Sequence, residues 1–598
     1  MKKLRTQTAI DGIGLEILKN GLETIADEMS IILVKSAYSP IVRDVMDFAT
    51  SISDANGQPI AQGLTQPFHL GSFNDVLAHL REHYAGRIAE GDVFIGNDPY
   101  TTNAQHLPDI FVIKPVFFRS ALLGWSATFA HHVDIGGLVP GSNALGATEI
   151  FQEGLRLPLL KLVDSGRLNE AVLDILRLNV RMPAFVLGDV RAQMAACLVG
   201  ERGLIAIAER HGPAEAERAF RALHRYAERL TRAEIKKIPD GDYTFTDHID
   251  GLGDQPEPIR LQVTLSIRDD RIAVDWKGTS SQVAGGINTH MPFTRSCCLA
   301  AIRSVISPEI PNCLGFARPI SVTAPRGSVV NATFPAPCGA RGITGFRMLD
   351  CLFGALAKAL PDRVPADSFG GNSLITFGFE GAGNTEVFVE TVMGNSGGAS
   401  WHDGQEGIPH IGANLSNVPV EQIEAQYPLR IRHYGFVPNS GGPGAYRGGL
   451  AIEREYEVCA ARAVLTLRTD KKHFPPHGLA GGGTGAPSVN KAITRTGEKD
   501  LPVLPTEPIP FAQGDVFRHA IPGGGGYGDP VRRDAISVLE DVLDGKVSRE
   551  HARSAYGVVL TATALEKDLR IDAPATVSLR KQIVKGRRTR QGGAFDEQ

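Results

Sequence analysis

The sequence predicts a mixed α/β and α+β protein of several domains, and three observations predict this class. The chain has 598 residues, well beyond the size at which a single hydrophobic core stops growing. Over the first 240 residues helix-type periodicity alternates with short β-type runs, and β-type runs dominate from there to about residue 530. We expect an N-terminal α/β domain with a metal site (1–240), a β-rich α+β middle domain (241–530), and a C-terminal helical hairpin with a basic tail (531–598).

The N-terminal part begins with an apolar stripe. Leucine, isoleucine and methionine recur in steps of three and four residues over 12–36, which predicts an amphipathic helix. The runs FATSISD, DVFIGND, IFVIKPVFF and LLGWSATFA predict strands separated by Asn, Asp, Gly and Pro turns. Over 168–236 the pattern is helical again, with Pro213 at a helix start and KKIPDG after its end. A boundary near residue 240 follows.

The middle part changes to β-type runs. Two of these, IRLQVTLSIRDDRIAVDWKG and LAIEREYEVCAARAVLTLRTD, are expected to be hairpins that turn at DD and AA. Two helices are expected near CCLAAIRSVI and GFRMLDCLFGALAKAL. In the last part we expect Gly545 to end the first helix of a helical hairpin. The tail SLRKQIVKGRRTRQGGAFDEQ is expected to be a disordered or partner-ordered end.

Composition limits the classes of partner. The 62 basic residues nearly balance the 66 acidic ones, so charge gives no case for a nucleic-acid or membrane-surface partner. The seven cysteines form no C-x-x-C pair, which argues against a disulfide framework and favours a reducing compartment. No secretory leader is expected at the start, and no apolar run approaches the roughly 20 residues of a bilayer span. We expect a soluble, cytoplasmic protein.

Histidine and aspartate residues flank two of the predicted strands. His106 and Asp109 in HLPD precede the strand 110–118, and His131 in HHVDIGG follows the strand 122–130. Two neighbouring antiparallel strands would bring these ends together. Imidazole and carboxylate are ligands of borderline divalent metals. The alternative is structural: turn capping by His106, backbone contacts by Asp109, and half-buried histidines at a strand end. Spacing alone favours this alternative.

Several glycine-rich motifs carry no strong prediction of chemistry. GNSGG (394–398) matches a nucleophile elbow, but glycines follow where an elbow needs a helix, so we expect a loop. GGGTGAPS (481–488) and PGGGGYGDP (522–530) lack a Gly-Lys-Ser/Thr sequence, and we expect turn glycines or close backbone packing. The chain therefore shows no nucleotide site of its own.

Two further groups of residues are open to more than one interpretation. Cys297 and Cys298 lie on an apolar helix pattern, which favours core packing over nucleophilic catalysis. The stretch 401–429 is either a functional loop or a hydrogen-bonded structural loop, and the structural interpretation is favoured. Its polar residues are His402, Asp403, His410, Glu421 and Glu424.

The chain resembles the hydantoinase B family along nearly its whole length. This family includes the B subunit of N-methylhydantoinase, half of 5-oxoprolinase, the β subunit of caprolactamase, and subunits of acetone and acetophenone carboxylases. The matching segments include GDVFIGNDPY, HLPDIFVIKPVF, AHHVDIGGLVPGS, ATEIFQEGLRLP, SNVPVEQIEAQYPL, SGGPGAYRGGLAIEREYEV and PGGGGYGDP. The resemblance implies a hetero-oligomer, such as a dimer of heterodimers. A hydantoinase A type subunit would use ATP and Mg²⁺ to phosphorylate a carbonyl oxygen, and this chain would carry a metal site.

The family's ligand pattern falls on Asp47, His106, Asp109 and His131, which implies Zn²⁺ or Mn²⁺. Water activated by the ion would attack, with Asp47 or Asp109 accepting a proton. The resemblance makes His132 a less favoured ligand and lets Asp134 orient a ligating histidine. MDFAT replaces the DFSC wording of many members, and TTNAQ replaces a glycine-rich lead into HLPD. These departures keep the ligands and leave the substrate class open.

The resemblance favours an ATP-dependent cyclic amidohydrolase acting on a hydantoin, 5-oxoproline or a related lactam. One alternative is a carboxylase component that joins a phosphorylated enol to CO₂ or bicarbonate at the same metal. A second alternative is a non-catalytic scaffold that stabilises the ATP-binding partner. Which ring or ketone reacts, which metal binds and the subunit stoichiometry remain open.

Overall fold

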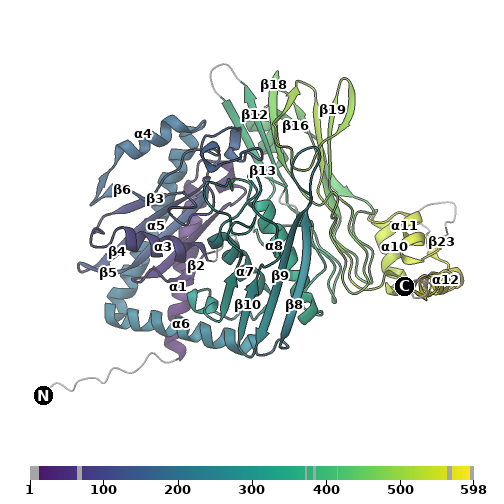
Figure 1. Ribbon diagram of the computed structural model, residues 1–598, viewed down its shortest axis with the longest axis horizontal. Helices are drawn as coiled ribbons and strands as arrows, with labels where there is room; N and C mark the ends of the chain where they lie inside the picture. The colour runs from purple at the N-terminus through teal and green to yellow at the C-terminus, as the bar shows by residue number, and fades with distance from the viewer. Residues whose placement is uncertain are drawn as a thin grey trace.

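The computed structural model describes residues 12–63, 71–370, 373–380, 385–413, 415–561 and 569–592. The start of the chain, where no export signal is predicted, and the end of the basic tail lie outside these ranges. Figure 1 shows helices and strands mixed along the whole chain, with several separate sheets. The predicted mixed α and β character is confirmed.

The N-terminal part is built on a seven-stranded sheet with the order β2-β1-β5-β4-β3-β6-β7. Its neighbouring strands pair antiparallel. The long hairpin of β4 (Asp109–Phe118) and β5 (Ala121–His131) lies at its centre, as predicted. The other strands are β1 (Phe48–Asp54), β2 (Pro59–Gln62), β3 (Val93–Gly96), β6 (Leu160–Asp164) and β7 (Arg167–Leu168).

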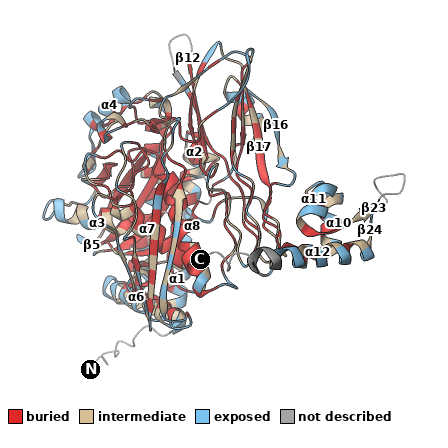
Figure 2. Cartoon of the chain, turned by 45° about the vertical axis from the view of Figure 1, so that its right-hand side comes forward, coloured by how far each residue is buried: buried red, intermediate tan, exposed pale blue. Residues whose placement is uncertain are grey.

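Helices cover both faces of this sheet. The predicted helix α1 (Gly12–Ser36) and the long α5 (Pro183–His211) pack on one face, and α3 (Ser72–His83) packs on the other. Successive β4 residues alternate between the two cores, with Val112 toward α5 and Phe111 toward α3. Because both faces are buried, the strand is a continuous apolar run. Figure 2 shows this interior as red.

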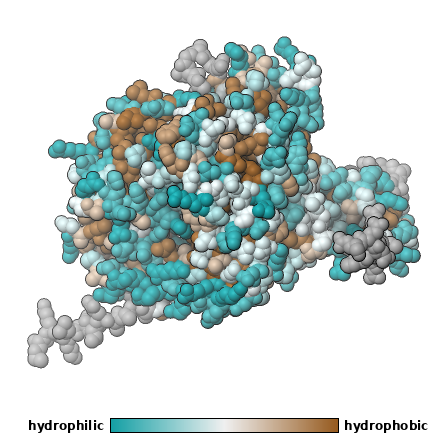
Figure 3. Space-filling model, in the orientation of Figure 1, coloured by the Kyte–Doolittle hydropathy of each residue, from teal (hydrophilic) through white to brown (hydrophobic). Residues whose placement is uncertain are grey.

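Two more helices complete the N-terminal part. In α6 (Pro213–Ile235) a stripe containing Phe220 and Leu223 is buried, and Pro213 starts the helix as predicted. In α4 (Glu170–Asn179), Leu178 is exposed, and apolar atoms gather in the corresponding upper left region of Figure 3. The predicted division of the chain at residue 240 stays a prediction.

The middle part begins with a four-stranded sheet, order β11-β10-β9-β8, next to two helices. The predicted hairpin of β9 and β10 turns at Asp269 and Asp270, as expected. The predicted helices are confirmed as α7 and α8, which pack on each other. The bounds are β8 (Gly241–Ile249), β9 (Ile259–Arg268), β10 (Arg271–Asp275), α7 (Met291–Val305), β11 (Ile320–Thr323) and α8 (Gly342–Ala359).

Two further sheets follow, with the orders β13-β12-β18-β21 and β16-β17-β22-β19-β20. Aromatic side chains fill the space between them: the ring of Phe377 on β12 lies 6.2 Å from that of Tyr456 on β17 and 6.4 Å from that of Phe517 on β22. The bounds are β12 (Leu374–Glu380), β13 (Thr385–Thr391), β16 (Leu429–Val437), β17 (Ala451–Val458), β18 (Arg462–Arg468), β19 (Val489–Thr494), β20 (Gly497–Asp500), β21 (Ile509–Ala512) and β22 (Val516–Ala520).

The predicted hairpin with a turn at AA is wrong. The strand β17 pairs with β16 and β22, whereas β18 pairs with β12 and β21. The short link between them therefore carries the chain from one sheet to the facing sheet. Each strand buries an apolar face in the space between the sheets, and this packing prevails over the local pairing that the sequence suggests.

The glycine-rich motifs pack backbone against backbone. A side-chain carbon on Gly448 would lie 1.9 Å from the carbonyl oxygen of Gly524, and one on Gly482 would lie 2.0 Å from that of Gly526. The Gly442 amide donates a 2.7 Å hydrogen bond to the Gly524 carbonyl oxygen. Only glycine permits these distances. The prediction of close backbone packing, rather than a phosphate cradle, is confirmed.

The C-terminal part contains the predicted helical hairpin, α10 (Ala535–Leu543) and α11 (Arg549–Tyr556), with Gly545 at φ 73° after the first helix. The predicted disorder is wrong for the described part of the tail, because α12 (Ala573–Gly592) is helical, and ordering by a partner stays a prediction. Its leucine, lysine, arginine and glutamine residues favour helix, and Arg580 donates hydrogen bonds to the carbonyl oxygens of Tyr556 and Arg533. These helices lie beyond the sheets in Figure 1.

Short helices and strands fill further parts of the described chain. The helices are α2 (Pro40–Arg43), α9 (Val420–Gln426), and 3₁₀ turns at Pro140–Ser142, Ile150–Gln152, Leu314–Ala317 and Pro530–Arg532. The strands are β14 (Gly394–Asn395), β15 (Glu406–Ile408), β23 (Leu560–Thr561) and β24 (Arg570–Ile571). Among the described helices, none has the length and apolar content required to span a membrane.

Candidate metal centre

Three predicted ligands meet at one end of the β4–β5 hairpin. Asp109 is the first residue of β4, and it is the register partner of His131, the last residue of β5. His106 lies in the turn before β4 and places Nε2 3.0 Å from Asp109 Oδ1 and 3.1 Å from His131 Nδ1. The third separation, from His131 Nδ1 to Asp109 Oδ1, is 3.2 Å. All three side chains are buried.

The protonation state of His106 follows from its second nitrogen. Its Nδ1 lies 2.7 Å from the carbonyl oxygen of Gly339, and because a carbonyl only accepts, Nδ1 carries the proton. Burial, assisted by Arg341, lowers the pKa of His106 to about 3, so the ring is neutral. Its Nε2 therefore presents a lone pair to His131 and Asp109.

Asp109 is held in its ionised form. Burial alone would raise its pKa, but the charged Arg341 guanidinium opposes burial, and the pKa of Asp109 lies well below its usual range. Arg341 forms an ion pair with Asp109 Oδ2 and bonds Gln105 Oε1 at 3.1 Å. Asp109 Oδ1 is thereby left to face the two imidazoles. The guanidinium fixes the carboxylate and leaves one oxygen for the histidine side.

The chemistry of this group fits a divalent cation. His106 has its only proton on Nδ1 and Asp109 has none, so no proton lies between His106 Nε2 and Asp109 Oδ1 at 3.0 Å. Two buried lone pairs at that distance repel each other, and a cation among the three donor atoms would relieve this repulsion. Two imidazole nitrogens and a carboxylate oxygen are the donor types that Zn²⁺ and related ions prefer.

Asp47 lies at the edge of this group. Its Oδ2 is 4.0 Å from His131 Nδ1, and its carbonyl oxygen accepts a 3.0 Å hydrogen bond from the His131 amide. The Asp47 side chain is 14% exposed, compared with 1% for Asp109, so it marks the less buried side. Burial, with a further contribution from Asp109, outweighs His131 and raises the pKa of Asp47 to about 6. Asp47 can approach an ion from the open side.

A buried carboxylate supports His106 from behind. Glu153 accepts hydrogen bonds from the amides of Gly339, at 2.6 Å, and Cys338, at 3.0 Å. The carbonyl oxygen of the same Gly339 accepts from His106 Nδ1. Burial raises the pKa of Glu153 to about 8. Glu153 thus fixes the short loop that sets the orientation of His106.

A second arginine lies near the carboxylates. Arg468, on β18, is buried and bonds Asn143 Oδ1 at 2.9 Å. Its Nε has no hydrogen-bond partner among the described residues. Burial, with Arg341 nearby, lowers the pKa of Arg468 to about 9, and Asp47 and Asp109 act in the opposite direction. The donor group therefore has two guanidinium groups beside it.

Two neighbouring residues have other roles. His132 Nε2 contacts Gln193 Oε1 at 3.1 Å, away from the three donor atoms, in agreement with its prediction as a less favoured ligand. The prediction that Asp134 orients a histidine is wrong. Its oxygens accept from the amides of Gly136, Gly141 and Arg181 and from the Arg181 side chain. Asp134 stabilises the turn that follows β5.

The other candidate segments are mainly structural. Asp403 pairs with Arg533, and Glu424 accepts the Ile431 amide, so part of 401–429 is hydrogen-bonded as favoured. GNSGG begins in the short strand β14 and continues as a loop, and no helix follows it, as expected. Burial raises the pKa of the Cys298 thiol to about 12 and places that of Cys297 far above its usual range. Both cysteines are core residues.

The architecture defines a class of protein: a multi-sheet protein of mixed α and β structure, with two buried histidines and an aspartate at the end of its central hairpin. The chain belongs to the Hydantoinase B/oxoprolinase family, whose sequence profile matches residues 11–530. It is 34% identical over 602 residues to the putative D-/L-hydantoinase B chain of Pseudomonas sp. strain NS671, covering 97% of this chain and 100% of that protein. It is 32% identical over 563 residues to the caprolactamase β chain of Pseudomonas jessenii, and the match covers 92% of this chain and 96% of that protein.

Solved structures agree with this assignment. The crystal structure of the ATP-dependent caprolactamase from Pseudomonas jessenii matches with a TM-score of 0.88 at 30% identity, covering 96% of this chain and 100% of that chain. A nucleotide-free acetone carboxylase structure matches with a TM-score of 0.90 at 20% identity, and the match covers 97% of this chain and 84% of that chain. The second likeness concerns the fold alone.

Sequence reasoning missed the residues that support the ligands. Arg341 and Arg468 lie more than 200 residues beyond His131 along the chain. Glu153 follows His131 by 22 residues but comes from a separate segment outside the hairpin. Glu153 belongs to ATEIFQEGLRLP, a segment of the family resemblance to which no role was assigned. The available signal was the position of Glu153 in this segment, because a glutamate that becomes buried requires a hydrogen-bond or charge partner.

Proposed function

We propose that this chain is the metal-containing B-type component of an ATP-dependent cyclic amidohydrolase. It would open a hydantoin, 5-oxoproline or lactam ring together with a hydantoinase A type subunit that uses ATP and Mg²⁺. The observation that carries the proposal is the convergence of His106 Nε2, His131 Nδ1 and Asp109 Oδ1, three buried donor atoms that lie 3.0–3.2 Å from one another. His106, Asp109 and His131 would hold a Zn²⁺ or Mn²⁺ ion, with Asp47 as the fourth ligand from the more exposed side.

The relatives support the class of reaction. Two proteins that match along nearly their whole length are named as components of a hydantoinase and of a caprolactamase, and both names concern cyclic amides. The matching structure with the higher identity is that of an ATP-dependent caprolactamase. Because these relatives are subunits of larger enzymes, we propose that this chain also works with an ATP-binding partner.

The chain's own residues would prepare the reaction in three ways. Arg341 keeps Asp109 ionised and fixed, and Glu153 and Gly339 keep the His106 lone pair turned toward the site. Arg468 adds a second guanidinium charge near Asp47 and Asp109, which would attract an anionic, phosphorylated intermediate. Asp47, on the more exposed side, would accept a proton from the attacking water.

The need for activation follows from the chemistry of the ring. An amide carbon is a poor electrophile, and phosphorylation of its oxygen creates a good leaving group and an anionic substrate. A divalent ion at His106, Asp109 and His131 would supply a Lewis acid that polarises this substrate and lowers the pKa of water.

The proposal is tested by reconstitution with the A-type subunit. The pair is incubated with ATP and, in separate reactions, a hydantoin, 5-oxoproline and a lactam, and ring opening is followed together with phosphate release. We expect phosphate release that depends on one cyclic amide. The same preparation with a ketone and labelled bicarbonate tests the carboxylase alternative, and label incorporation without ring opening would replace the proposal. Full turnover by His106→Ala would favour the scaffold alternative.

A further inference from the structure

The C-terminal helices form a small unit at one end of the molecule. Figures 1 and 2 both show α10, α11 and α12 standing apart from the sheets. The unit has a core of its own, formed by Val538, Val547, Ala552, Tyr556 and Val558. The family profile ends at residue 530, before α10 begins. The surface of this unit therefore lies outside the part of the chain that the profile describes.

The helix α10 carries an exposed stripe of apolar and acidic side chains. Ile536 and Leu543 are 57% and 53% exposed, and Glu540, which lies between them, is also exposed. The steps of four and then three residues place these side chains on one face of the helix. Val538 and Asp541, on the other side of the helix, are buried. The fold of the single chain thus leaves the α10 stripe, Ile536, Glu540 and Leu543, open to solvent.

The helix α12 carries a stripe with the same spacing and the opposite charge. Val577 and Val584 are 53% and 37% exposed, and Lys581, which lies between them, is also exposed. The helix attaches to the rest of the unit by a different face. There the Thr576 hydroxyl accepts a hydrogen bond from a backbone amide, and the Arg580 guanidinium donates to two carbonyl oxygens. The α12 stripe, Val577, Lys581 and Val584, is therefore also open to solvent.

The charge of each whole helix agrees with its stripe. The helix α10 contains Glu540 and Asp541 and no lysine or arginine, whereas α12 contains six lysine and arginine residues and no acidic residue. Because opposite charges attract and like charges repel, α10 of one chain is suited to α12 of another chain and not to a second α10. Within one chain both stripes are exposed, so they do not cover each other.

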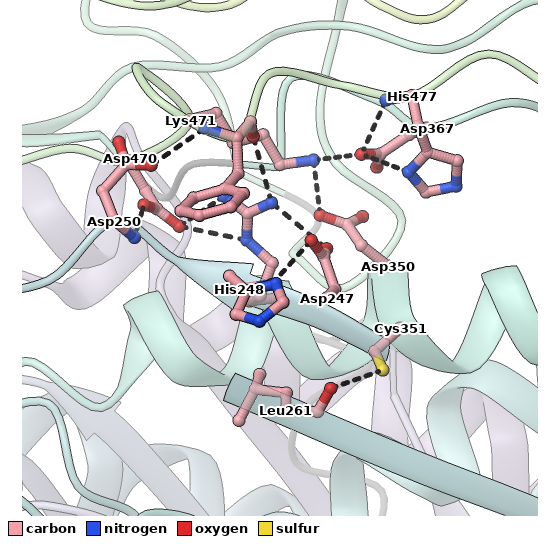
Figure 4. A network of polar contacts seen from close by, with 12 residues as sticks. Asp247, His248, Asp250, Leu261, Asp350, Cys351, Asp367, Asp470, Lys471 and His477 are labelled. Atoms are coloured by element: carbon pink, nitrogen blue, oxygen red, sulfur yellow. Dashed lines mark hydrogen bonds and ion pairs between the residues drawn. The ribbon is translucent and has the colours of Figure 1, made fainter. Parts of the chain in front are cut away.

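Buried charges in the middle part are paired within the chain, in contrast to the charges of the two stripes. Figure 4 shows one such network, in which the Lys471 ammonium lies 2.7 Å from Asp350 Oδ2 and 2.6 Å from Asp367 Oδ2. Glu540 and Lys581, on the surface, form no ion pair with any described residue. A second molecule therefore meets no competing partner at either charge.

We propose that the chain forms a two-fold dimer in which α10 of each copy packs against α12 of the other. The apolar residues of the α10 stripe would pack against those of the α12 stripe, and Glu540 would pair with Lys581. A two-fold axis makes this contact reciprocal, so each copy contributes both stripes and the assembly closes at two chains. The apolar residues would exclude water from the two ion pairs. The contact is separate from the candidate metal centre and requires neither a metal nor turnover.

A docking surface for the hydantoinase A type subunit is the competing explanation. Such a surface would account for exposed apolar side chains on the C-terminal unit. It gives no reason for two stripes on the same chain that share one spacing and carry opposite charges. A second copy of this chain supplies the matching stripe for each, so the two stripes favour self-association.

The test is sedimentation velocity of the full chain over a range of concentrations, and we expect a dimer that dissociates on dilution. Glu540→Lys and Lys581→Glu each place like charges opposite one another at both contacts of the dimer. Each variant should therefore weaken dimerisation at least about tenfold. Both positions are exposed, so the circular dichroism spectrum should stay unchanged. An equimolar mixture of the two variants should dimerise about as tightly as the unchanged chain, because each contact then joins a lysine to a glutamate.

Glu209→Lys is the matched control, since it makes the same change of charge at an exposed position in the last turn of α5, in the N-terminal part. Its dimer should dissociate at the same concentration as that of the unchanged chain.

The proposal is overturned if the unchanged chain stays monomeric, if either single variant dimerises as tightly as the control, or if the mixture of the two variants stays monomeric. Assembly of the unchanged chain beyond a dimer would overturn the two-fold arrangement. A monomeric chain whose binding to the A-type subunit is lost in Glu540→Lys would assign the surface to that subunit instead.

Discussion

Asp109 and His131 face each other as register partners across the β4–β5 hairpin, and their side chains approach to 3.2 Å between Oδ1 and Nδ1. Backbone pairing therefore fixes the separation of two candidate ligands before any metal binds. The third, His106, comes from the turn that leads into the same hairpin. This arrangement places the donors on the rigid centre of the largest sheet, where preorganisation is greatest.

Removing one ligand should abolish metal binding and leave the fold intact. His131→Ala deletes a side chain at the end of a strand, and little of the core depends on it. We expect metal content to fall from about one ion per chain to a trace, with product formation lost and the circular dichroism spectrum unchanged. The measurement is elemental analysis after gel filtration. His433→Ala, which alters a half-exposed histidine on β16, should keep its metal, and loss of soluble protein in His131→Ala would indicate a structural histidine.

Glu153 should act on metal affinity through the Gly339 loop. Above pH 8 Glu153 is ionised and accepts both backbone amides, whereas in Glu153→Gln an amide NH₂ group must face one of them, and the loop that orients His106 shifts. We expect the metal to bind about 10 to 100 times more weakly, the range for residues that orient ligands. Competition with a chromogenic chelator measures this. The control is Glu149→Gln, which alters an exposed residue on the same segment and should leave metal affinity unchanged. Equal metal affinities in the two variants would show that Glu153 does not orient the ligands.

Arg341 should contribute strongly to stability because its partner is buried. Arg341→Leu leaves the Asp109 charge without its guanidinium partner, and removing one member of a buried pair costs about 3–5 kcal/mol of unfolding free energy. Urea denaturation of the chelator-treated chain measures the loss. Arg177→Leu breaks the exposed pair with Asp174 on α4 and should cost less than about 1 kcal/mol. Similar losses in both variants would mean that Asp109 is not ionised as described.

Acid should destabilise the protein in part through His519. This residue on β22 is fully buried and donates to Asn490 Oδ1, and burial lowers its pKa to about 4. Between pH 6.5 and 4 the unfolded chain binds a proton at this position that the folded chain excludes, so stability falls as pH falls. At pH 5 the loss from this group is on the order of 2 kcal/mol relative to pH 7.

The variant His519→Gln removes this titration. Its free energy of unfolding should therefore decrease less between pH 7 and pH 5 than that of the unchanged chain, as measured by urea denaturation at both pH values. His433→Gln, which alters an exposed histidine, should keep the full pH dependence. An identical decrease in His519→Gln and in the unchanged chain would contradict the account of His519.

The elements with strong local signals could be predicted from the sequence. The apolar stripe of α1 and the runs of β4 and β5 follow from periodicity, and the hairpin then placed Asp109 beside His131. The pairing of β17 and β18 could not be predicted, because the choice between a hairpin and a crossover to the facing sheet depends on aromatic packing by residues such as Phe377. The helix α12 was missed because its charge suggested disorder.

Some residues of the candidate metal centre could likewise be predicted from the sequence, and others could not. His106, Asp109 and His131 are near one another along a hairpin, so local reasoning reached them, and the family resemblance added Asp47. Arg341 comes from a distant segment and Glu153 from outside the hairpin, and their roles depend on burial and on the direction of hydrogen bonds. Burial turns an ordinary arginine or glutamate into a residue with a required partner. Single-sequence patterns do not encode such partners.

The most direct measurement is an anomalous difference map from crystals of the purified chain, collected on both sides of the zinc and manganese absorption edges. The account predicts one peak about 2.0–2.2 Å from His106 Nε2, His131 Nδ1 and Asp109 Oδ1, with Asp47 completing the coordination. A map without a peak among these atoms, after the crystals are soaked in each metal, would contradict the proposed metal centre.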